Sequence, residues 1–151
     1  MKQHTLKHVI PWILVMLYIT WIFSNSFASG TVSGAESSLI ANWILSLFMK
    51  VGISIPFEAF HFYIRKAAHF LEYALLGFLC FWAARKKSLW KGTVPTVILI
   101  GCTIPLCDEG IQMFSPGRTP AFRDCLIDMS GYLCGAMFFT LLLWISHCIT
   151  K

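Results

Sequence analysis

Apolar residues dominate four separate stretches of the chain, and each stretch is close to the length of a membrane-crossing helix. Such a helix needs roughly 20 mostly apolar residues to cross about 30 Å of hydrocarbon. Barrel strands would instead alternate apolar and polar positions, and the chain has no such pattern. We therefore predict an all-α integral membrane bundle of about four transmembrane helices. They are expected at residues 9–27, 67–84, 93–107 with a polar extension to residue 113, and 125–147.

The segment between the first two predicted spans, residues 28–63, has a different pattern. Residues 29–34 have the composition of a flexible polar connector. Over residues 38–50, apolar side chains then recur at helical spacing opposite a polar face. We expect an amphipathic helix here, capped at Ser37 or Ser38. It is expected to be too short to span and to lie in the extracytoplasmic membrane interface.

A second apolar run follows at residues 53–63, and Pro56 and Glu58 interrupt it. We expect this run to lead into the second span. The alternative is that the two runs together form a re-entrant hairpin, and the sequence leaves both arrangements open.

Composition supports a single membrane domain over residues 1–151. The chain is 57% hydrophobic and 13% charged, whereas a soluble domain has roughly 25% charged residues. The net charge of +5 comes from basic residues that flank the apolar stretches, so we expect contacts with anionic lipid and not with nucleic acid. The six cysteines fall in the membrane segments without a CxxC pair. They are expected to pack as small apolar side chains, with disulfides or metal ligands as the alternative.

Basic residues also predict the orientation of the chain. A tight cluster, Arg85 to Lys91, connects the second and third spans, and such clusters favour the cytoplasmic side. Both termini are then cytoplasmic. Lys2 and Lys7 precede the first apolar run as they would in a signal peptide, but that run is longer than the roughly 7–15 residues of a signal core. We therefore expect an uncleaved first helix.

Polar residues inside the predicted spans are the most informative feature of the sequence. Charged side chains in a membrane helix are costly, so they normally face a partner or a polar interior. In the second span, Arg65, His69, Glu72 and Tyr73 are spaced to share one helical face, and Lys66 is adjacent. This face begins close to the extracytoplasmic end of the span.

The last two spans bring further polar residues to the same end of the bundle. The third span reaches Asp108, Glu109 and Gln112 only at its outer end, and the fourth span begins with Asp124 and Asp128. We therefore expect these side chains to converge with those of the second span in the outer leaflet.

The connection between these two spans has turn chemistry at Pro116-Gly117, which is expected to place Arg118 at the outer rim. Arg123, just before the fourth span, is expected to lie near the same polar side chains. Gly131 and Gly135, four residues apart, continue the helical face that carries Asp124 and Asp128. Their small size predicts that another helix approaches closely there.

Three interpretations of the polar cluster stay open. In a fully paired ionic network, Lys66 or Arg118 would pair with Asp108 or Asp124, and His69 would donate to Glu72. In an acid–base site, His69 beside Glu72 would act as a base and Arg118 would hold a phosphate. In a divalent-metal site, His69 and Glu72 would join opposing carboxylates, although no second histidine supports it. We assign no metal and leave any cofactor unknown.

Two motifs are similar to those of the VanZ-like family of bacterial membrane proteins. They are KAAHFLEYALLG at residues 66–77 and DEGIQMFSPGR at residues 108–118, and Asp124, Asp128, Gly131 and Gly135 follow. The resemblance covers residues 65–136. The name-giving members are associated with low-level resistance to teicoplanin, a glycopeptide antibiotic. The resemblance thus implies a location in the bacterial plasma membrane and a role in the cell envelope.

We expect an outer-leaflet pocket that binds or modifies an envelope lipid or a lipid-linked precursor. The residues expected to carry a reaction are His69, Glu72, Asp108, Glu109, Asp124 and Asp128. Those expected to bind the substrate are Arg65, Lys66, Tyr73, Gln112 and Arg118. The alternatives are a non-enzymatic protein that sequesters the antibiotic or shields its target, and a small proton-coupled lipid transporter. The sequence specifies neither a reaction nor an oligomeric state.

Overall fold

The computed structural model describes residues 2–85, 92–119 and 121–150. Over these residues the chain forms five helices and no strand. They are α1 (Lys2–Ser26), α2 (Gly30–Lys50), α3 (Phe57–Ala84), α4 (Val94–Gln112) and α5 (Phe122–Ile149). The all-α prediction is confirmed.

Four of these helices, α1, α3, α4 and α5, are long and apolar enough to cross a membrane. This confirms the predicted set of four spans. The largest difference in bounds concerns α3, which begins at Phe57 and not at residue 67. The charged cluster from Lys86 to Lys91, used to predict orientation, lies outside the described residues.

The early start of α3 follows from Pro56 and Glu58. Pro56 is the N-cap residue, where its missing backbone N–H breaks no helical hydrogen bond. Glu58 lies in the first turn, where a negative side chain complements the positive end of the helix dipole. The two residues that interrupt the apolar run therefore mark a helix start, and the run does lead into the second span.

The segment before α3 is more regular than the sequence suggested. Ser29 caps α2, and its side-chain oxygen accepts a hydrogen bond from the Val32 backbone N–H at 3.4 Å. The flexible connector predicted at residues 29–34 is therefore wrong, because a serine directly before a helix satisfies its free N–H groups. The caps predicted at Ser37 or Ser38 are also wrong.

Ser37 instead ties α2 to α3. Its side chain is buried, and Ser37 Oγ lies 2.7 Å from His61 Nε2. The prediction that this helix is too short to span a membrane is wrong, because α2 has 21 residues. Its polar composition is what separates it from the four apolar helices.

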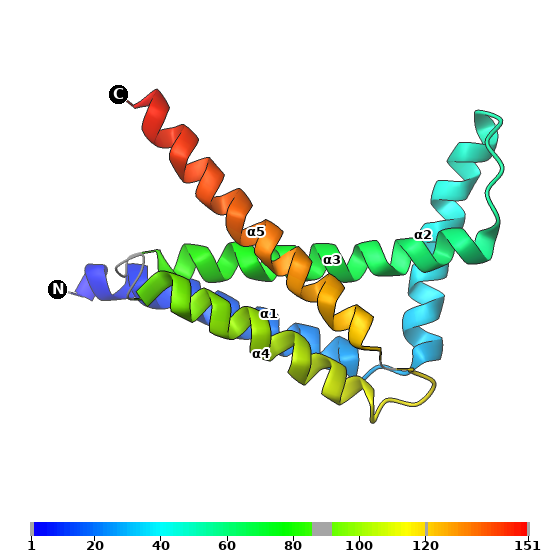
Figure 1. Ribbon diagram of the computed structural model, residues 1–151, viewed down its shortest axis with the longest axis horizontal. Helices are drawn as coiled ribbons and strands as arrows, with labels where there is room; N and C mark the ends of the chain where they lie inside the picture. The colour runs from blue at the N-terminus through cyan, green and yellow to red at the C-terminus, as the bar shows by residue number, and fades with distance from the viewer. Residues whose placement is uncertain (1, 86–91, 120, 151) are drawn as a thin grey trace.

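Figure 1 shows how the helices are arranged. The two termini lie at one side of the molecule, and α2 crosses the opposite end at a steep angle to α1, α3 and α4. We call this opposite end the α2 end. It also holds the connection from α4 to α5, while the C-terminal part of α5 extends away from the other helices.

Glycines allow α3 and α5 to cross at close range. A Cβ atom on Gly131 would overlap the backbone of Phe70, and one on Gly135 would overlap the backbone of Ala74. The close approach predicted for these two glycines is confirmed. A buried core then surrounds the crossing, formed by Val15, Ile22, Tyr73, Leu76, Cys80, Ala84, Val97, Tyr132 and Ala136. All six cysteines are free thiols, and two of them, Cys80 and Cys125, are buried.

Candidate functional site

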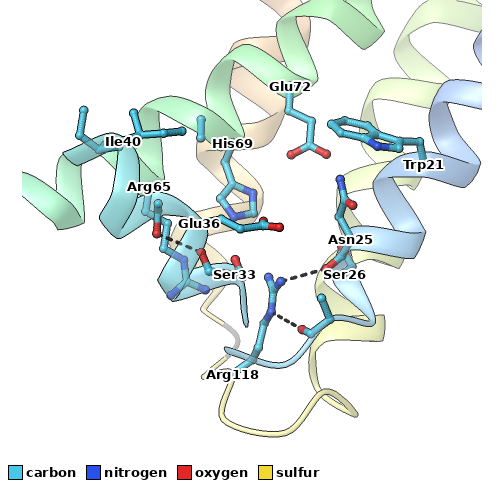
Figure 2. A pocket seen from close by; sticks show the side chains of 14 residues that line it. Trp21, Asn25, Ser26, Ser33, Glu36, Ile40, Arg65, His69, Glu72 and Arg118 are labelled. Carbon is cyan, nitrogen blue, oxygen red and sulfur yellow. Dashed lines mark hydrogen bonds between the residues drawn. The ribbon is translucent and has the colours of Figure 1, made fainter. Parts of the chain in front are cut away.

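A cavity of about 350 Å³ lies at the α2 end, between α1, α2, α3 and the loop that follows α4. Figure 2 shows polar side chains directed into it from all four segments. Its charged or titratable lining residues are Glu36, Arg65, His69, Glu72 and Arg118. Three of these, Arg65, His69 and Glu72, were predicted to share one face of the second span, and that prediction is confirmed.

Arg118 is held in place by the turn that precedes it. Gly117 has φ 73°, and the Arg118 backbone N–H donates to the Ser115 carbonyl at 3.2 Å, as expected of a tight turn with glycine at its third position. The guanidinium then donates to two carbonyl oxygens at the end of α1, that of Asn25 in its last turn at 3.0 Å and that of Ala28 just after it at 3.1 Å. The Pro116-Gly117 turn thus positions Arg118 at the cavity, and its place on the outer side of the membrane stays a prediction.

The Arg118 guanidinium keeps its charge in this position. Partial burial lowers its pKa, and the neighbouring positive charge of Arg65 contributes to the same shift. An arginine pKa starts so high that the group stays protonated in proteins. Arg65 and Arg118 thus supply two positive charges to one cavity.

Acidic side chains and His69 face the same space. Figure 2 shows the Glu72 carboxyl directed toward Asn25, and the Glu36 carboxyl between His69 and Arg118. The backbone of Glu72 is tied to α1, because the Tyr18 hydroxyl donates to its carbonyl oxygen at 3.2 Å. The cavity is therefore a mixed-charge site, with a proton-transfer group, His69, among its walls.

A second polar group lies deeper in the bundle, where α1, α3, α4 and α5 meet. Asp108 is 1% exposed and accepts hydrogen bonds from the Ser26 hydroxyl and from Gln112 Nε2, the latter at 3.0 Å. Asp128 is 0% exposed, and Tyr73 is also fully buried. We call Asp108, Asp128, His69 and Tyr73 the buried cluster.

The buried cluster is incompletely hydrogen-bonded. His69 Nδ1 lies 3.6 Å from Asp128 Oδ1, which is an ion-pair distance and too long for a hydrogen bond. Within the described residues, neither carboxylate oxygen of Asp128 has a hydrogen-bond partner, and the same holds for His69 Nδ1 and the Tyr73 hydroxyl. Buried polar groups without partners are uncommon, and each needs an explanation such as a bound water, an ion or a catalytic role.

The remaining predicted residues lie around these two groups. Lys66 forms an ion pair with Asp124. One carboxyl oxygen of Glu109 accepts a hydrogen bond from the Ala121 backbone N–H, which anchors the start of α5. Arg123 is exposed and lines neither the cavity nor the buried cluster.

The fully paired ionic network predicted as one interpretation is wrong in its His69–Glu72 pairing and correct in one lysine–aspartate pairing. Arg118 donates to backbone carbonyls and not to an aspartate. His69 faces Asp128 and not Glu72. The pairing of Lys66 with an aspartate is confirmed.

Sequence reasoning also missed two contributing helices. No residue of the first helix was among the predicted site residues, yet Ser26 binds Asp108, and Trp21 and Asn25 line the cavity. From α2, Glu36 lines the cavity as well. The signal was present in the polar run Ser24-Asn25-Ser26 at the end of an otherwise apolar helix.

Comparison with known proteins gives one match. A family model described as VanZ/LLP1 matches residues 9–143, which extends well beyond the motif region at residues 65–136. No curated protein and no solved structure matches the chain. Because the family model spans most of the chain, including α2 and the whole polar site, this membrane protein belongs to the VanZ/LLP1 family.

Proposed function

We propose that this protein binds the anionic head group of an envelope lipid, or of a lipid-linked envelope precursor, in the cavity at its α2 end. The observation that carries the proposal is the pair of arginines in one cavity of head-group size. Arg65 and Arg118 line a space of about 350 Å³, at the lower end of the range typical of small-molecule sites. Arginine is the side chain best suited to phosphate oxygens, because its planar group donates two parallel hydrogen bonds.

The arginines differ in how far they are committed to the fold. Arg118 already donates to two carbonyl oxygens, which fixes its position before a ligand arrives. Arg65 enters the cavity from α3 (Figure 2). A pre-positioned cation lowers the entropic cost of binding, and a second cation adds affinity for a charged oxygen.

Apolar side chains at the same cavity suit the attached lipid chains. Trp21 is 51% exposed and Ile40 is 53% exposed, and both line the cavity together with Ile64. Since α1 and α3 are membrane-spanning helices, an acyl or prenyl chain can run from this rim into the bilayer. A head group in the cavity with its tail along these side chains satisfies both polar and apolar contacts.

The side chains in the cavity are suited to one kind of reaction step, proton transfer. His69 and Glu72 line the same space as the arginines, so a bound head group would lie beside a base and a carboxyl. Membership of the VanZ/LLP1 family supports a role in the envelope. Altered glycopeptide susceptibility then follows from a changed lipid or precursor at the membrane surface.

Lipid retention tests the proposal. The purified protein would be mixed with phosphatidylglycerol and phosphatidylcholine in detergent micelles, and bound lipid would be counted by native mass spectrometry. We expect the wild type to retain phosphatidylglycerol at least tenfold better than phosphatidylcholine. Arg65→Gln should remove most of this preference, because the substitution removes a charge without touching the hydrogen bonds that hold the Arg118 loop.

The matched control is Lys50→Gln, which removes an exposed charge at the far end of α2, outside the cavity. It should leave the lipid preference unchanged. Excess inorganic phosphate should compete if phosphate recognition alone carries the affinity. Equal loss of preference in both variants would mean that general surface charge attracts the lipid, and the proposal would be abandoned.

A further inference from the structure

The buried cluster contains three side chains whose ligand atoms could surround one cation. One atom each of His69, Asp108 and Asp128 lie within 4.8 Å of one another. We infer that these three residues bind a divalent transition-metal ion beneath the cavity floor. Asp108 and Asp128 do not line the cavity, and of the three residues only His69 is shared with it, so the inference is argued from contacts that the lipid proposal does not use.

The geometry suits such an ion. Zinc lies about 2.0–2.2 Å from histidine nitrogen and carboxylate oxygen, so two ligand atoms in a tetrahedral site are roughly 3.4 Å apart. His69 Nδ1 and Asp128 Oδ1 are 3.6 Å apart, close to that separation and too far apart to bond directly. The remaining ligand-atom separations in the set are no longer than 4.8 Å.

An independent observation points to a ligand at this place. Asp128 is completely buried, and within the described chain neither of its carboxylate oxygens has a hydrogen-bond partner. One of these oxygens is directed at His69 Nδ1, which is itself without a partner there. A buried carboxylate is costly unless it is paired or coordinates a metal.

The nearby cations do not supply that partner. Lys66 pairs with Asp124, and Arg118 donates to backbone carbonyls. A divalent ion would balance the two negative charges of Asp108 and Asp128, leaving a neutral site in a low-dielectric surrounding. The charge balance and the unpartnered oxygens thus favour the same ligand.

Asp108 already has the supporting contacts of a metal-binding carboxylate. The Ser26 hydroxyl donates to one of its oxygens and Gln112 Nε2 to the other. Such outer hydrogen bonds orient a ligand and leave a lone pair on each oxygen for the ion. Because these contacts come from α1 and α4, an ion at this position would join four helices.

The donor set indicates the class of metal. One imidazole nitrogen and two carboxylates suit zinc or manganese better than calcium or magnesium, which prefer sites made only of oxygen. Zinc is the probe of choice, since it accepts three protein ligands and one further oxygen.

Equilibrium dialysis against zinc chloride tests the inference. The detergent-solubilised full chain would first be treated with a chelator, and bound zinc would be measured by elemental analysis. We expect about one zinc per chain, with affinity at least tenfold weaker in His69→Ala and in Asp128→Asn. His147→Ala and Glu58→Gln are matched controls at positions away from the cluster and should bind as the wild type does.

Thermal unfolding separates metal binding from a structural effect of the variants. Zinc should raise the midpoint of the wild type by several degrees and leave Asp128→Asn unchanged. In chelator, Asp128→Asn should be at least as stable as the wild type, because it removes a buried charge without a partner. Zinc below about one ion per ten chains, or equal binding in Asp128→Asn, would overturn the inference.

The zinc and lipid results can be told apart. Arg65→Gln should keep full zinc binding even where lipid preference is lost. A wild-type protein that binds no zinc but still retains phosphatidylglycerol would overturn the metal site alone.

Discussion

Two aspartates one helical turn apart on α5 have opposite surroundings. Asp124 is 18% exposed at its side chain and pairs with Lys66, whereas the Asp128 side chain is 1% exposed and faces His69 without a hydrogen bond. The four-residue spacing placed both on one face correctly. Their difference arises from depth in the bundle, because Lys66 lies near the rim and no lysine follows it toward the core. We therefore propose a structural role for Asp124 and a role in the site for Asp128.

The Lys66–Asp124 pair should stabilise the junction of α3 and α5. Lys66→Ala and Asp124→Ala should each destabilise the protein. The double variant should lose less than the sum of the two, with a coupling of about 0.5–2 kcal/mol. Reversible unfolding in detergent of the wild type and all three variants gives this value. Strictly additive losses would mean that the two charges do not interact.

At the residue scale, the sequence predicted which side chains gather but, apart from the pairing of Lys66 with an aspartate, not their partners. Helical spacing brought Arg65, His69 and Glu72 to one face, because a repeat of 3.6 residues is fixed by the backbone. The contact of Ser26 with Asp108 could not be read in this way, since the two residues are 82 positions apart. Such pairings depend on helix packing, which a single sequence does not contain.

The crossing of α3 and α5 determines the geometry of the site at the scale of whole elements. α3 carries His69 and α5 carries Asp128, so the distance between these ligand atoms depends on how closely the two helices approach. Gly131 and Gly135 bring the backbones together where any side chain would collide. The packing of the helices and the geometry of the buried cluster are therefore coupled.

Gly135→Ala should separate the two helices. Its Cβ would overlap the Ala74 backbone, so we expect a destabilisation of about 1–3 kcal/mol or more, together with weaker zinc binding. Gly110→Ala is the control, because a Cβ at Gly110 meets no atom within 4 Å. That helical substitution should be neutral or stabilise by about 0.4–1 kcal/mol. Thermal unfolding of both variants measures the contrast, and similar midpoints would contradict the role of close packing.

Element boundaries were predictable where apolar residues dominate and less so elsewhere. The spans at α1, α4 and α5 follow from long apolar runs. α2 began eight residues before the expected cap at Ser38, because Ser29 provides the cap and Gly30 and Gly34 do not prevent a helix there. Ser29 caps the start of α2 and Pro56 caps the start of α3, whereas the sequence pattern suggested a flexible connector at the first position and only an interruption of the apolar run at the second.

At the scale of the whole molecule, the two termini lie at one side and the cavity at the other (Figure 1). An even number of spans brings both termini to the same side. The polar residues at one end of α3, α4 and α5 indicate a polar site at the opposite side. The sequence predicted both. The direction of the bundle across the membrane stays a prediction from the basic residues.

Reporter fusions test that direction. A fluorescent protein that folds only in the cytoplasm should fluoresce when fused after Lys151, and alkaline phosphatase at the same place should be inactive. Phosphatase inserted between α2 and α3, near exposed Gly52, should be active, because we expect that loop outside the cytoplasm. The reverse pattern would place the cavity on the cytoplasmic side and rule out an outer-leaflet substrate.

The central claim is that an anionic lipid head group occupies the cavity between α1, α2 and α3. Labelling with a photoactivatable phosphatidylglycerol, reactive near its head group, tests it most directly in reconstituted vesicles. Peptide mass spectrometry should locate the adducts at the cavity rim, on Trp21, Ile40 and Ile64, and Arg65→Gln should abolish them. Adducts spread over lipid-facing residues such as Met137 and Trp144, unchanged in Arg65→Gln, would contradict the account.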